Sequence, residues 1–200
     1  MRRASPESTT TDAALPAGAG RPGAPELPPA DACGHFGLRI ARDGTWYYHG
    51  SPIGRKAIAK LFATVLRRED DGSYWLVTPA ERGRIDVDDA PFIATELEVR
   101  QEMGRQQLIF TTNLDRVVTA DAEHRLRVEP WPDRGASGEG GTPYLHLGAG
   151  LDARLSRPVY YQLAEIAEVR ETERGPAYGV WSEGIFFPLG PALAADAGTG

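Results

Sequence analysis

Residues 53–79 read IGRKAIAKLFATVLRREDDGSYWLVTP, the clearest amphipathic pattern in this chain of 200 residues. Apolar residues recur there at spacings of three and four, which predicts a helix with one apolar face made of Ile58, Leu61, Phe62, Val65 and Leu66. The helix begins either near Ser51 or at Arg55. An acidic turn over 69–72 closes it, and residues 73–77 then predict a short buried strand.

Two basic residues, Arg55 and Lys56, fall in the first turn of this helix. The helix dipole disfavours positive charge there by about 0.3–1 kcal/mol. An anionic ligand that accepts hydrogen bonds from Arg55 and from the free N–H groups of that turn would offset the penalty. The plainer alternative is a solvated arginine, or one that pairs with Glu81 or Asp89.

The rest of the folded part predicts many short strands separated by Gly, Asp and Asn turns. We expect them at residues 36–40, 45–49, 84–87, 92–99, 107–112, 116–119, 125–128, 144–147, 177–181 and 185–189. Such a series favours a curved or barrel-like antiparallel sheet. A second helix is predicted over 158–169, starting at Ser156 or Arg157, after a short turn at 151–155.

The two predicted helices have similar surroundings, which suggests a repeat. IGR at 53–55 and LSR at 155–157 are each followed by a leucine six residues after the arginine. An aromatic segment ending in histidine precedes each, and the apolar strands YWLV and YGVW follow. A repeated strand–helix–strand unit would make Arg55 and Arg157 equivalent. If they faced each other between the halves, they would form a better anion clamp than either alone.

The two ends of the chain differ in composition from the middle. Residues 1–34 are rich in Ala, Pro, Gly, Ser and Thr, so we expect a disordered tail. Residues 132–142 and 191–200 predict a flexible loop and a flexible end. No apolar h-region follows the N-terminal arginines and no run of 18 apolar residues occurs. A soluble, cytoplasmic protein with no membrane partner is therefore the expectation.

Charge and cysteine content limit the possible partners. The chain has 22 basic and 28 acidic residues, a net charge of −6, which disfavours binding to duplex nucleic acid. Any anionic ligand must therefore meet a local cluster of cations. Cys33 is the single cysteine, so neither a disulfide framework nor a thiolate metal site is expected. Asp86, Asp88 and Asp89 lack a calcium-loop pattern and a nearby histidine, and we predict no metal or other cofactor.

Six motifs in this order identify a family resemblance: DGTWYYHGSPIGR from 43, LFATVLRREDDGSYWLVTPAE from 61, IDVDDAPF from 85, FTTN from 110, PYLHLGAGLDARLSRPVYYQL from 143 and WSEGIFFPLG from 181. Over residues 36–190 the chain resembles the bacterial family called domain of unknown function 1285. The resemblance implies a duplicated core, a C-terminal half like a pleckstrin-homology fold, and a ligand site between the halves for a nucleotide-like molecule, with a role in signalling. The family pattern has an arginine where this chain has Gly148, so one possible anion contact is absent.

The resulting prediction is an α+β protein of two similar units, residues 36–83 and 84–190, each with short antiparallel strands packed on one helix. The expected function is binding of an anionic, base-containing molecule between them. Phosphate would contact Arg55, Arg154 and Arg157, and the base would stack on Trp46 or Tyr160. Further ligand contacts are expected from Thr78, Glu81, Asp89, Phe92, Thr112 and Asn113.

Two alternatives to a binding module stay open. An enzyme acting on a similar ligand could use Glu81 or Asp89 as general acid or base. Against it, the sequence has no paired carboxylates, catalytic histidine or nucleophile motif, and we predict no catalytic residue. The other alternative is a module whose strand edges and cationic helix contact a protein partner.

Overall fold

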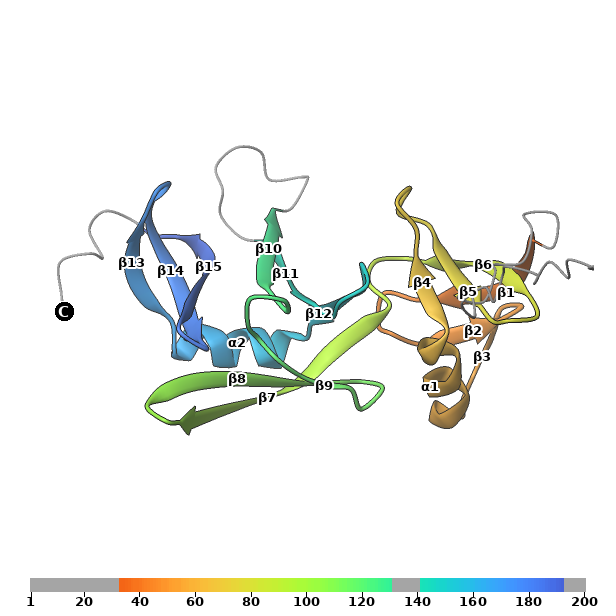
Figure 1. Ribbon diagram of the computed structural model, residues 1–200, viewed down its shortest axis with the longest axis horizontal. Helices are drawn as coiled ribbons and strands as arrows, with labels where there is room; N and C mark the ends of the chain where they lie inside the picture. Colours follow the sequence, from red (N-terminus) through yellow and green to blue (C-terminus); the bar gives the residue numbers. More distant parts are fainter. Residues whose placement is uncertain (1–32, 131–140, 193–200) are drawn as a thin grey trace, which may run out of the picture.

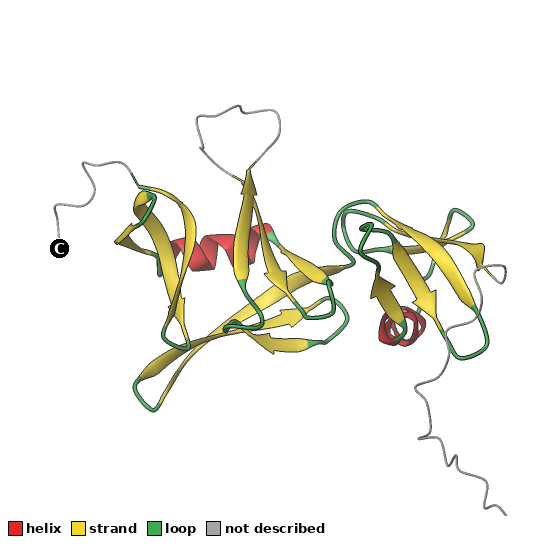
Figure 2. Cartoon of the chain, turned by 45° about the horizontal axis from the view of Figure 1, so that its top comes forward, coloured by secondary structure: helices red, strands yellow, loops and turns green. Residues whose placement is uncertain are grey.

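The computed structural model describes residues 33–130 and 141–192. Strands make up most of the regular structure there, with two helices of nine residues, one in each half of the chain (Figure 2). Two six-stranded sheets and one three-stranded sheet contain all the strands of the described residues. The fold is therefore mostly β, and its two halves lie side by side along the long axis of the molecule (Figure 1).

The first unit is one six-stranded sheet with a single helix. Its strands are β1 (Cys33–Ile40), β2 (Trp46–Tyr48), β3 (Ser51–Pro52), β4 (Leu66–Arg68), β5 (Tyr74–Val77) and β6 (Arg82–Val87), in the order β3-β2-β1-β6-β5-β4. Neighbouring strands are antiparallel except β1 and β6, which run parallel at the centre. Helix α1 (Lys56–Thr64) connects β3 to β4.

The second unit contains the other two sheets. The six-stranded sheet has β7 (Phe92–Glu102), β8 (Arg105–Thr112), β9 (Val117–Thr119), β10 (Leu126–Pro130), β11 (Gly141–His146) and β12 (Asp152–Leu155), in the order β10-β11-β12-β7-β8-β9. Only β12 and β7 pair in parallel. Helix α2 (Arg157–Glu165) leads into the third sheet, β13 (Glu168–Thr172), β14 (Gly175–Ser182) and β15 (Ile185–Pro191).

The order of elements is consistent with a duplication. In the first unit three strands, one helix and three strands follow one another from β1 to β6, and the same succession runs from β10 to β15. The first and last strands of each series are neighbours, β1 beside β6 and β10 beside β15. The hairpin β7–β8 and strand β9 are additional in the second unit. Arg55 is the N-cap of α1 and Arg157 is the first residue of α2, so the two arginines predicted to be equivalent lie within one position of each other relative to the helix starts.

Both helices are shorter than the sequence predicts. Of the two predicted starts for α1, the later is correct, since Ser51 lies in β3 and Arg55 is the N-cap. The helix ends at Thr64, and the next residues form β4, which pairs with β5. Likewise α2 ends at Glu165 and β13 pairs with β14. Leu, Arg and Glu favour helices locally, but strand pairing outweighs that weak preference.

Other predictions need correction in the second sheet and at the ends. Residues 152–155 form a strand and not a turn, and two parallel pairs interrupt the expected antiparallel sheets. Cys33, Gly34, Gly141, Thr142 and Pro191 belong to strands and not to flexible segments. The predicted tail, loop and C-terminal end otherwise lie outside the described residues.

The first sheet extends past residue 83, where we expected the first unit to end, because β6 continues to Val87. The pleckstrin-homology-like character of the second unit stays a prediction. None of the helices in the described part of the chain is long and apolar enough to cross a membrane.

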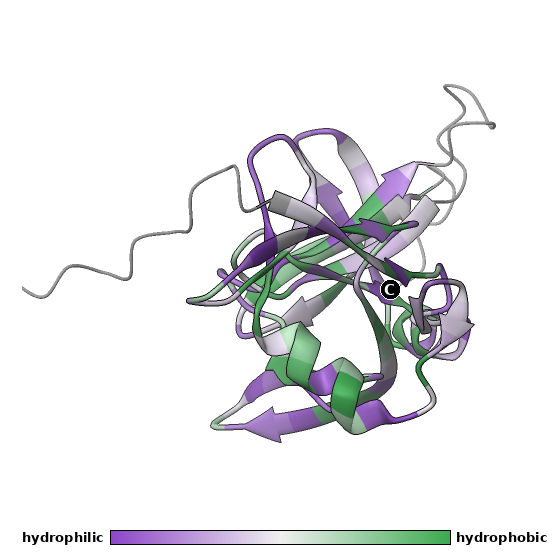
Figure 3. Ribbon diagram, turned by 90° about the vertical axis from the view of Figure 1, so that its right-hand side faces the viewer, coloured by the Kyte–Doolittle hydropathy of each residue, from purple (hydrophilic) through white to green (hydrophobic). Residues whose placement is uncertain are grey.

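One hydrophobic cluster runs through both units and includes Trp46, Leu66, Phe110, Leu163 and Phe187, each at most 2% exposed. Helix α1 is less buried than its apolar pattern predicts. Its ribbon alternates between hydrophobic and hydrophilic residues (Figure 3). Ala59 is its only buried residue, whereas Ile58 and Leu61 are 37% and 65% exposed. Part of the apolar face therefore faces the second unit across an open cleft.

Candidate ligand-binding cleft

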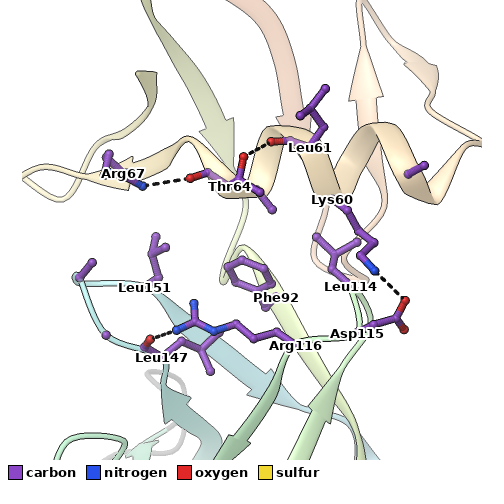
Figure 4. Close-up of a pocket in the computed structure, with 14 residues that line it drawn as sticks. Lys60, Leu61, Thr64, Arg67, Phe92, Leu114, Asp115, Arg116, Leu147 and Leu151 are labelled. Atoms are coloured by element: carbon purple, nitrogen blue, oxygen red, sulfur yellow. Dashed lines mark hydrogen bonds and ion pairs between the residues drawn. The ribbon is translucent and has the colours of Figure 1, made fainter. Parts of the chain in front are cut away.

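A cleft of about 770 Å³ lies between α1 and the second unit (Figure 4). The first unit lines it with Ala57, Lys60, Leu61, Ala63, Thr64 and Arg67. The second unit lines it with Phe92, Leu114, Asp115, Arg116, Leu147, Gly148, Ala149 and Leu151. We call this space the inter-unit cleft. Its volume is within the range of about 300–1,000 Å³ that is usual for small-molecule sites.

The helical repeat of α1 determines which of its side chains form the first wall of the inter-unit cleft. Ala57, Lys60, Leu61 and Thr64 are spaced by three or four residues and therefore share one face of α1. Arg67 continues the same wall on β4. This face is not the one that packs on the sheet, where Phe62 contacts Trp46 with 5.9 Å between the ring centroids.

Two turns form the opposite wall. The turn between β8 and β9 contributes Leu114, Asp115 and Arg116, and Asp115 has a positive φ of 61°. The turn between β11 and β12 has three successive residues in the left-handed region, Gly148, Ala149 and Gly150, at φ 86°, 52° and 72°. A non-glycine residue seldom adopts this conformation, which suits the sequence Gly-Ala-Gly at this sharp reversal.

The floor of the cleft is apolar. Phe92, Leu114, Leu147 and Leu151 are between 1% and 8% exposed, and Phe92 lies at its centre (Figure 4). These side chains belong to three separate parts of the second unit. The parallel pairing of β12 with β7 places the turn at 147–151 next to Phe92. The floor therefore depends on long-range strand pairing.

Two arginines reach the cleft from opposite walls. Arg116 donates a hydrogen bond from Nη2 to the carbonyl oxygen of Leu147. Arg67 donates from Nη1 to the carbonyl oxygen of Leu66 at 2.7 Å and, more weakly, to that of Thr64 at 3.4 Å. In the part of the chain that the structure describes, neither guanidinium lies within ion-pair distance of a carboxylate. Burial lowers the pKa of Arg116, and no carboxylate offsets that effect.

The remaining charges of the cleft form one ion-pair group. Asp115 accepts hydrogen bonds from Lys56 Nζ at 2.5 Å and from Lys60 Nζ at 3.3 Å. These bonds hold the pKa of Asp115 below its usual value. The single acid of the cleft is thus already balanced by two lysines. Arg67 and Arg116 add two cations that pair with no carboxylate among the described residues, in a chain whose net charge is −6.

Three of the residues predicted to contact a ligand lie in or beside this cleft. Phe92 forms the floor. Thr112 is buried, and its hydroxyl accepts a hydrogen bond from the Arg116 N–H at 3.0 Å, which helps to place Arg116. Asn113 joins the units: its side-chain oxygen accepts from the Ile93 N–H at 3.0 Å, and its amide donates to the carbonyl oxygen of Gly44 at 3.3 Å.

Four others lie away from it. Trp46 is 2% exposed in the core, so its ring offers no open face. The Thr78 hydroxyl donates to the carbonyl oxygen of Glu81 at 2.9 Å, and both residues line a groove on another side of α1. Arg55 is exposed at the N-cap of α1 and lines none of the cavities described here.

The last four predicted residues are grouped elsewhere. Arg154, Arg157 and Tyr160 line a separate cavity together with Arg42. Asp89 lies beside it, 3.3 Å from the Nε atoms of both Arg42 and Arg154, and accepts the Tyr144 hydroxyl at 2.6 Å. Burial and this hydrogen bond raise the pKa of Tyr144. Arg55 and Arg157 therefore do not line a common cavity among those described.

Sequence reasoning missed Arg67, Arg116, Lys60 and Asp115 as site residues. The family motif FTTN ends three residues before Arg116, which was the one signal near it. Within residues 33–130 and 141–192, no three His, Cys, Asp or Glu side chains gather closely enough to hold a metal ion. Asp86 and Asp88 instead pair with His35 and Arg39.

Comparison with known proteins gives a consistent result. Residues 27–90 match a family described as "Domain of unknown function (DUF1285), N-terminal domain", and residues 91–189 match "Protein of unknown function (DUF1285), C-terminal domain". A crystal structure of a DUF1285 family protein from Silicibacter pomeroyi is 40% identical, with a TM-score of 0.71 over 80% of this chain and 82% of that one. A second, from Shewanella baltica, is 28% identical, with a TM-score of 0.50 over 64% and 91%. No curated protein matches the chain.

Proposed function

We propose that this chain, which belongs to the DUF1285 family, binds a small anionic molecule in the inter-unit cleft without transforming it chemically. The observation that carries the proposal is the pair Arg67 and Arg116, one from each unit, which border the same cavity without a carboxylate partner among the described residues. A guanidinium that lacks a protein acid in a partly buried cleft is best compensated by an anionic ligand.

The two arginines are already held in position. Each uses one terminal nitrogen to bond backbone carbonyls: Arg67 Nη1 donates to Leu66 and more weakly to Thr64, and Arg116 Nη2 donates to Leu147. Each therefore keeps its other guanidinium nitrogens for a ligand. Because the side chains are ordered before binding, less conformational entropy is lost when the ligand arrives.

The apolar floor indicates what the rest of the ligand is like. Phe92, Leu114, Leu147 and Leu151 offer a hydrophobic surface beside the cations. A molecule with an anionic group and a flat, weakly polar part fits both features. A nucleotide has this combination: its base would cover Leu61, which is 65% exposed, above the buried apolar floor, while its phosphate meets Arg67 and Arg116. We extend the proposal to a role in signalling, since a ligand bound by both units changes how firmly they are joined.

A binding role fits the cleft better than an enzymatic one. Asp115 is its only carboxylate, and the hydrogen bonds from Lys56 and Lys60 keep it ionised and occupied. No histidine is among the lining residues. Neither Glu81 nor Asp89, the predicted acid–base candidates, lines the cleft. A general acid or base has to reach the reacting atom within hydrogen-bond distance.

A thermal shift assay with a panel of nucleotides, inorganic phosphate and carboxylates tests the proposal. A ligand at 100 times its dissociation constant stabilises the protein by about 2.7 kcal/mol. That corresponds to about 5–10 °C for a chain of this size. The Arg116→Gln variant should lose at least about tenfold in affinity, since a charged hydrogen bond is worth about 1.5–3 kcal/mol.

The matched control is Arg105→Gln, which changes an exposed arginine at the start of β8, away from the cleft. It should bind the ligand like the wild type. A panel without any stabilising compound contradicts the proposal. So does a ligand that binds Arg116→Gln as tightly as it binds the wild type. Appearance of a product after incubation would favour the enzymatic alternative.

A further inference from the structure

A second cavity of about 770 Å³ is lined mainly by arginine and tyrosine side chains. Arg42 comes from the turn between β1 and β2, Arg154 from β12, and Arg157, Tyr160 and Tyr161 from the first turns of α2. We call it the arginine cavity. It shares no lining residue with the inter-unit cleft.

The charges around the arginine cavity do not balance. Asp89 pairs with two of the three arginines: its Oδ2 atom lies 3.3 Å from Nε of Arg42 and 3.3 Å from Nε of Arg154. It also accepts the Tyr144 hydroxyl. Arg157 forms no ion pair with the described residues. Asp43 adds a weaker electrostatic attraction to Arg154. Two carboxylates therefore face Arg42 and Arg154, and the guanidinium of Arg157 is left without a carboxylate partner among the described residues.

Several donors of these arginines are unused by the described part of the protein. Arg154 donates from Nη2 to the carbonyl oxygen of Arg42 at 2.7 Å, which leaves its Nη1. Arg42 approaches Asp89 through Nε alone, and its terminal nitrogens make no hydrogen bond within residues 33–130 and 141–192. A fork of N–H donors of this kind matches the oxygens of a phosphate group.

Helix α2 adds to the positive potential. Its first turn contains no acidic residue, and the N-cap Ser156 makes no side-chain cap. The Ser156 hydroxyl is buried without a hydrogen-bond partner among the described residues. The helix dipole thus acts in the same direction as the three arginines. The dipole of α2 disfavours the positive charge of Arg157 in its first turn, and a bound anion would offset this repulsion.

We propose that the arginine cavity binds a phosphate monoester, with its phosphate on Arg42, Arg154 and Arg157 and its organic part against Tyr160. Tyr160 is partly exposed, and an aromatic ring of this kind beside a phosphate site can stack on a flat organic group. The inference does not depend on the proposed function of the inter-unit cleft, because the two sites use different residues.

Calorimetric titration of the full chain with inorganic phosphate and with adenosine monophosphate tests this site. The wild type should bind phosphate in the arginine cavity, and Arg157→Gln should weaken that binding at least tenfold. Arg157 is exposed and unpaired, so the variant should fold. Arg116→Gln, which alters the cleft, should leave this binding event unchanged. In the Arg116→Gln variant, whose cleft should bind nucleotides weakly, an adenosine monophosphate affinity above that of phosphate supports the contact with Tyr160, and equal affinities overturn it.

Chemical modification supplies a readout that does not rely on a variant. Phenylglyoxal modifies accessible arginines, and peptide mass spectrometry locates them. Phosphate should protect Arg157 and Arg42 and leave Arg105 reactive. Equal modification of Arg157 with and without phosphate overturns the proposal, as does phosphate binding that is lost in Arg116→Gln and retained in Arg157→Gln. The latter result would leave the proposed function of the cleft intact.

Discussion

Replacing Asp152 with asparagine should destabilise the fold more than the loss of an exposed ion pair does. The Asp152 side chain is only 9% exposed. It accepts two hydrogen bonds from Arg127, at 2.9 and 3.0 Å, and lies 3.1 Å from His146 Nδ1. Arg68 of the first unit approaches it at 3.7 Å. The substitution keeps the shape of the side chain but removes the charge that Arg127 and Arg68 share.

The magnitude follows from the exposure of the partners. Removing one partner of a buried ion pair costs about 3–5 kcal/mol. Arg127 and Arg68 are 40% and 39% exposed, and Arg127 also pairs with Glu129 at 3.0 Å, so water and Glu129 compensate in part. We therefore expect a loss of about 2–3 kcal/mol in the free energy of unfolding, near the lower limit for such pairs. The melting temperature should fall by about 4–12 °C.

Urea denaturation followed by tryptophan fluorescence measures this loss. The control is Glu98→Gln, which breaks the pair between Glu98 and Arg100, whose side chains are 59% and 52% exposed. That change should cost less than about 1 kcal/mol. A loss for Asp152→Asn that is no larger than the loss for Glu98→Gln would refute the reasoning that this buried carboxylate stabilises the fold through its arginine partners.

Three further predictions concern packing, backbone and pH. Phe110→Ala should cost about 3–5 kcal/mol in unfolding free energy because Phe110 is fully buried, whereas Met103→Ala, at 97% exposure, should change it by less than about 0.5 kcal/mol in the same denaturation assay. Gly44→Ala should lower the melting temperature more than Gly184→Ala: both have positive φ, but only at Gly44 would the added Cβ approach another side chain, Asn113 at 2.6 Å. Hydrogen bonds from Lys56 and Lys60 lower the pKa of Asp115, so its stabilising effect is present above its unfolded pKa of about 3.9 and is lost as the pH falls through the folded value. Asp115→Asn should therefore flatten the pH dependence of the urea midpoint in that acidic range, and an unchanged dependence would contradict this.

Local patterns predicted most strands because the information for a hairpin lies in adjacent residues. Alternating apolar residues and the turn at Asp43 and Gly44 indicated β1 and β2, and Gly44 has the φ of 82° that such a turn requires. Strands β7, β8, β14 and β15 were predicted from the same kind of local pattern, and they form the antiparallel pairs β7–β8 and β14–β15. The similar surroundings of the two helices suggested a repeated unit, and the family resemblance implied the same duplication.

Short strands that depend on distant partners could not be predicted from local sequence. Strands β4 and β13 follow directly after the helices and contain Leu, Arg and Glu, which also continue a helical pattern. Strand β12 has four residues and pairs with the start of β7, about 60 residues away in the chain. Strand pairing of this kind is decided by the whole sheet.

The same limit explains why the site was only partly predicted. Phe92 and Thr112 were chosen from motifs, and both lie in or beside the cleft. Arg116 looked like an ordinary turn residue, and Arg67 belonged to the polar side of a helix predicted to be longer. Their common cavity exists because α1 ends at Thr64 and because β12 pairs with β7. Neither event leaves a signal in the neighbouring sequence.

A crystal structure of the protein with the compound that stabilises it most tests the central claim directly. We predict that the anionic group of the ligand lies between Arg67 and Arg116, with hydrogen bonds of about 2.7–2.9 Å, and that its apolar part contacts Leu61 above the floor of the cleft. A ligand bound elsewhere, with Arg67 and Arg116 still bonded only to backbone carbonyls, would contradict the account.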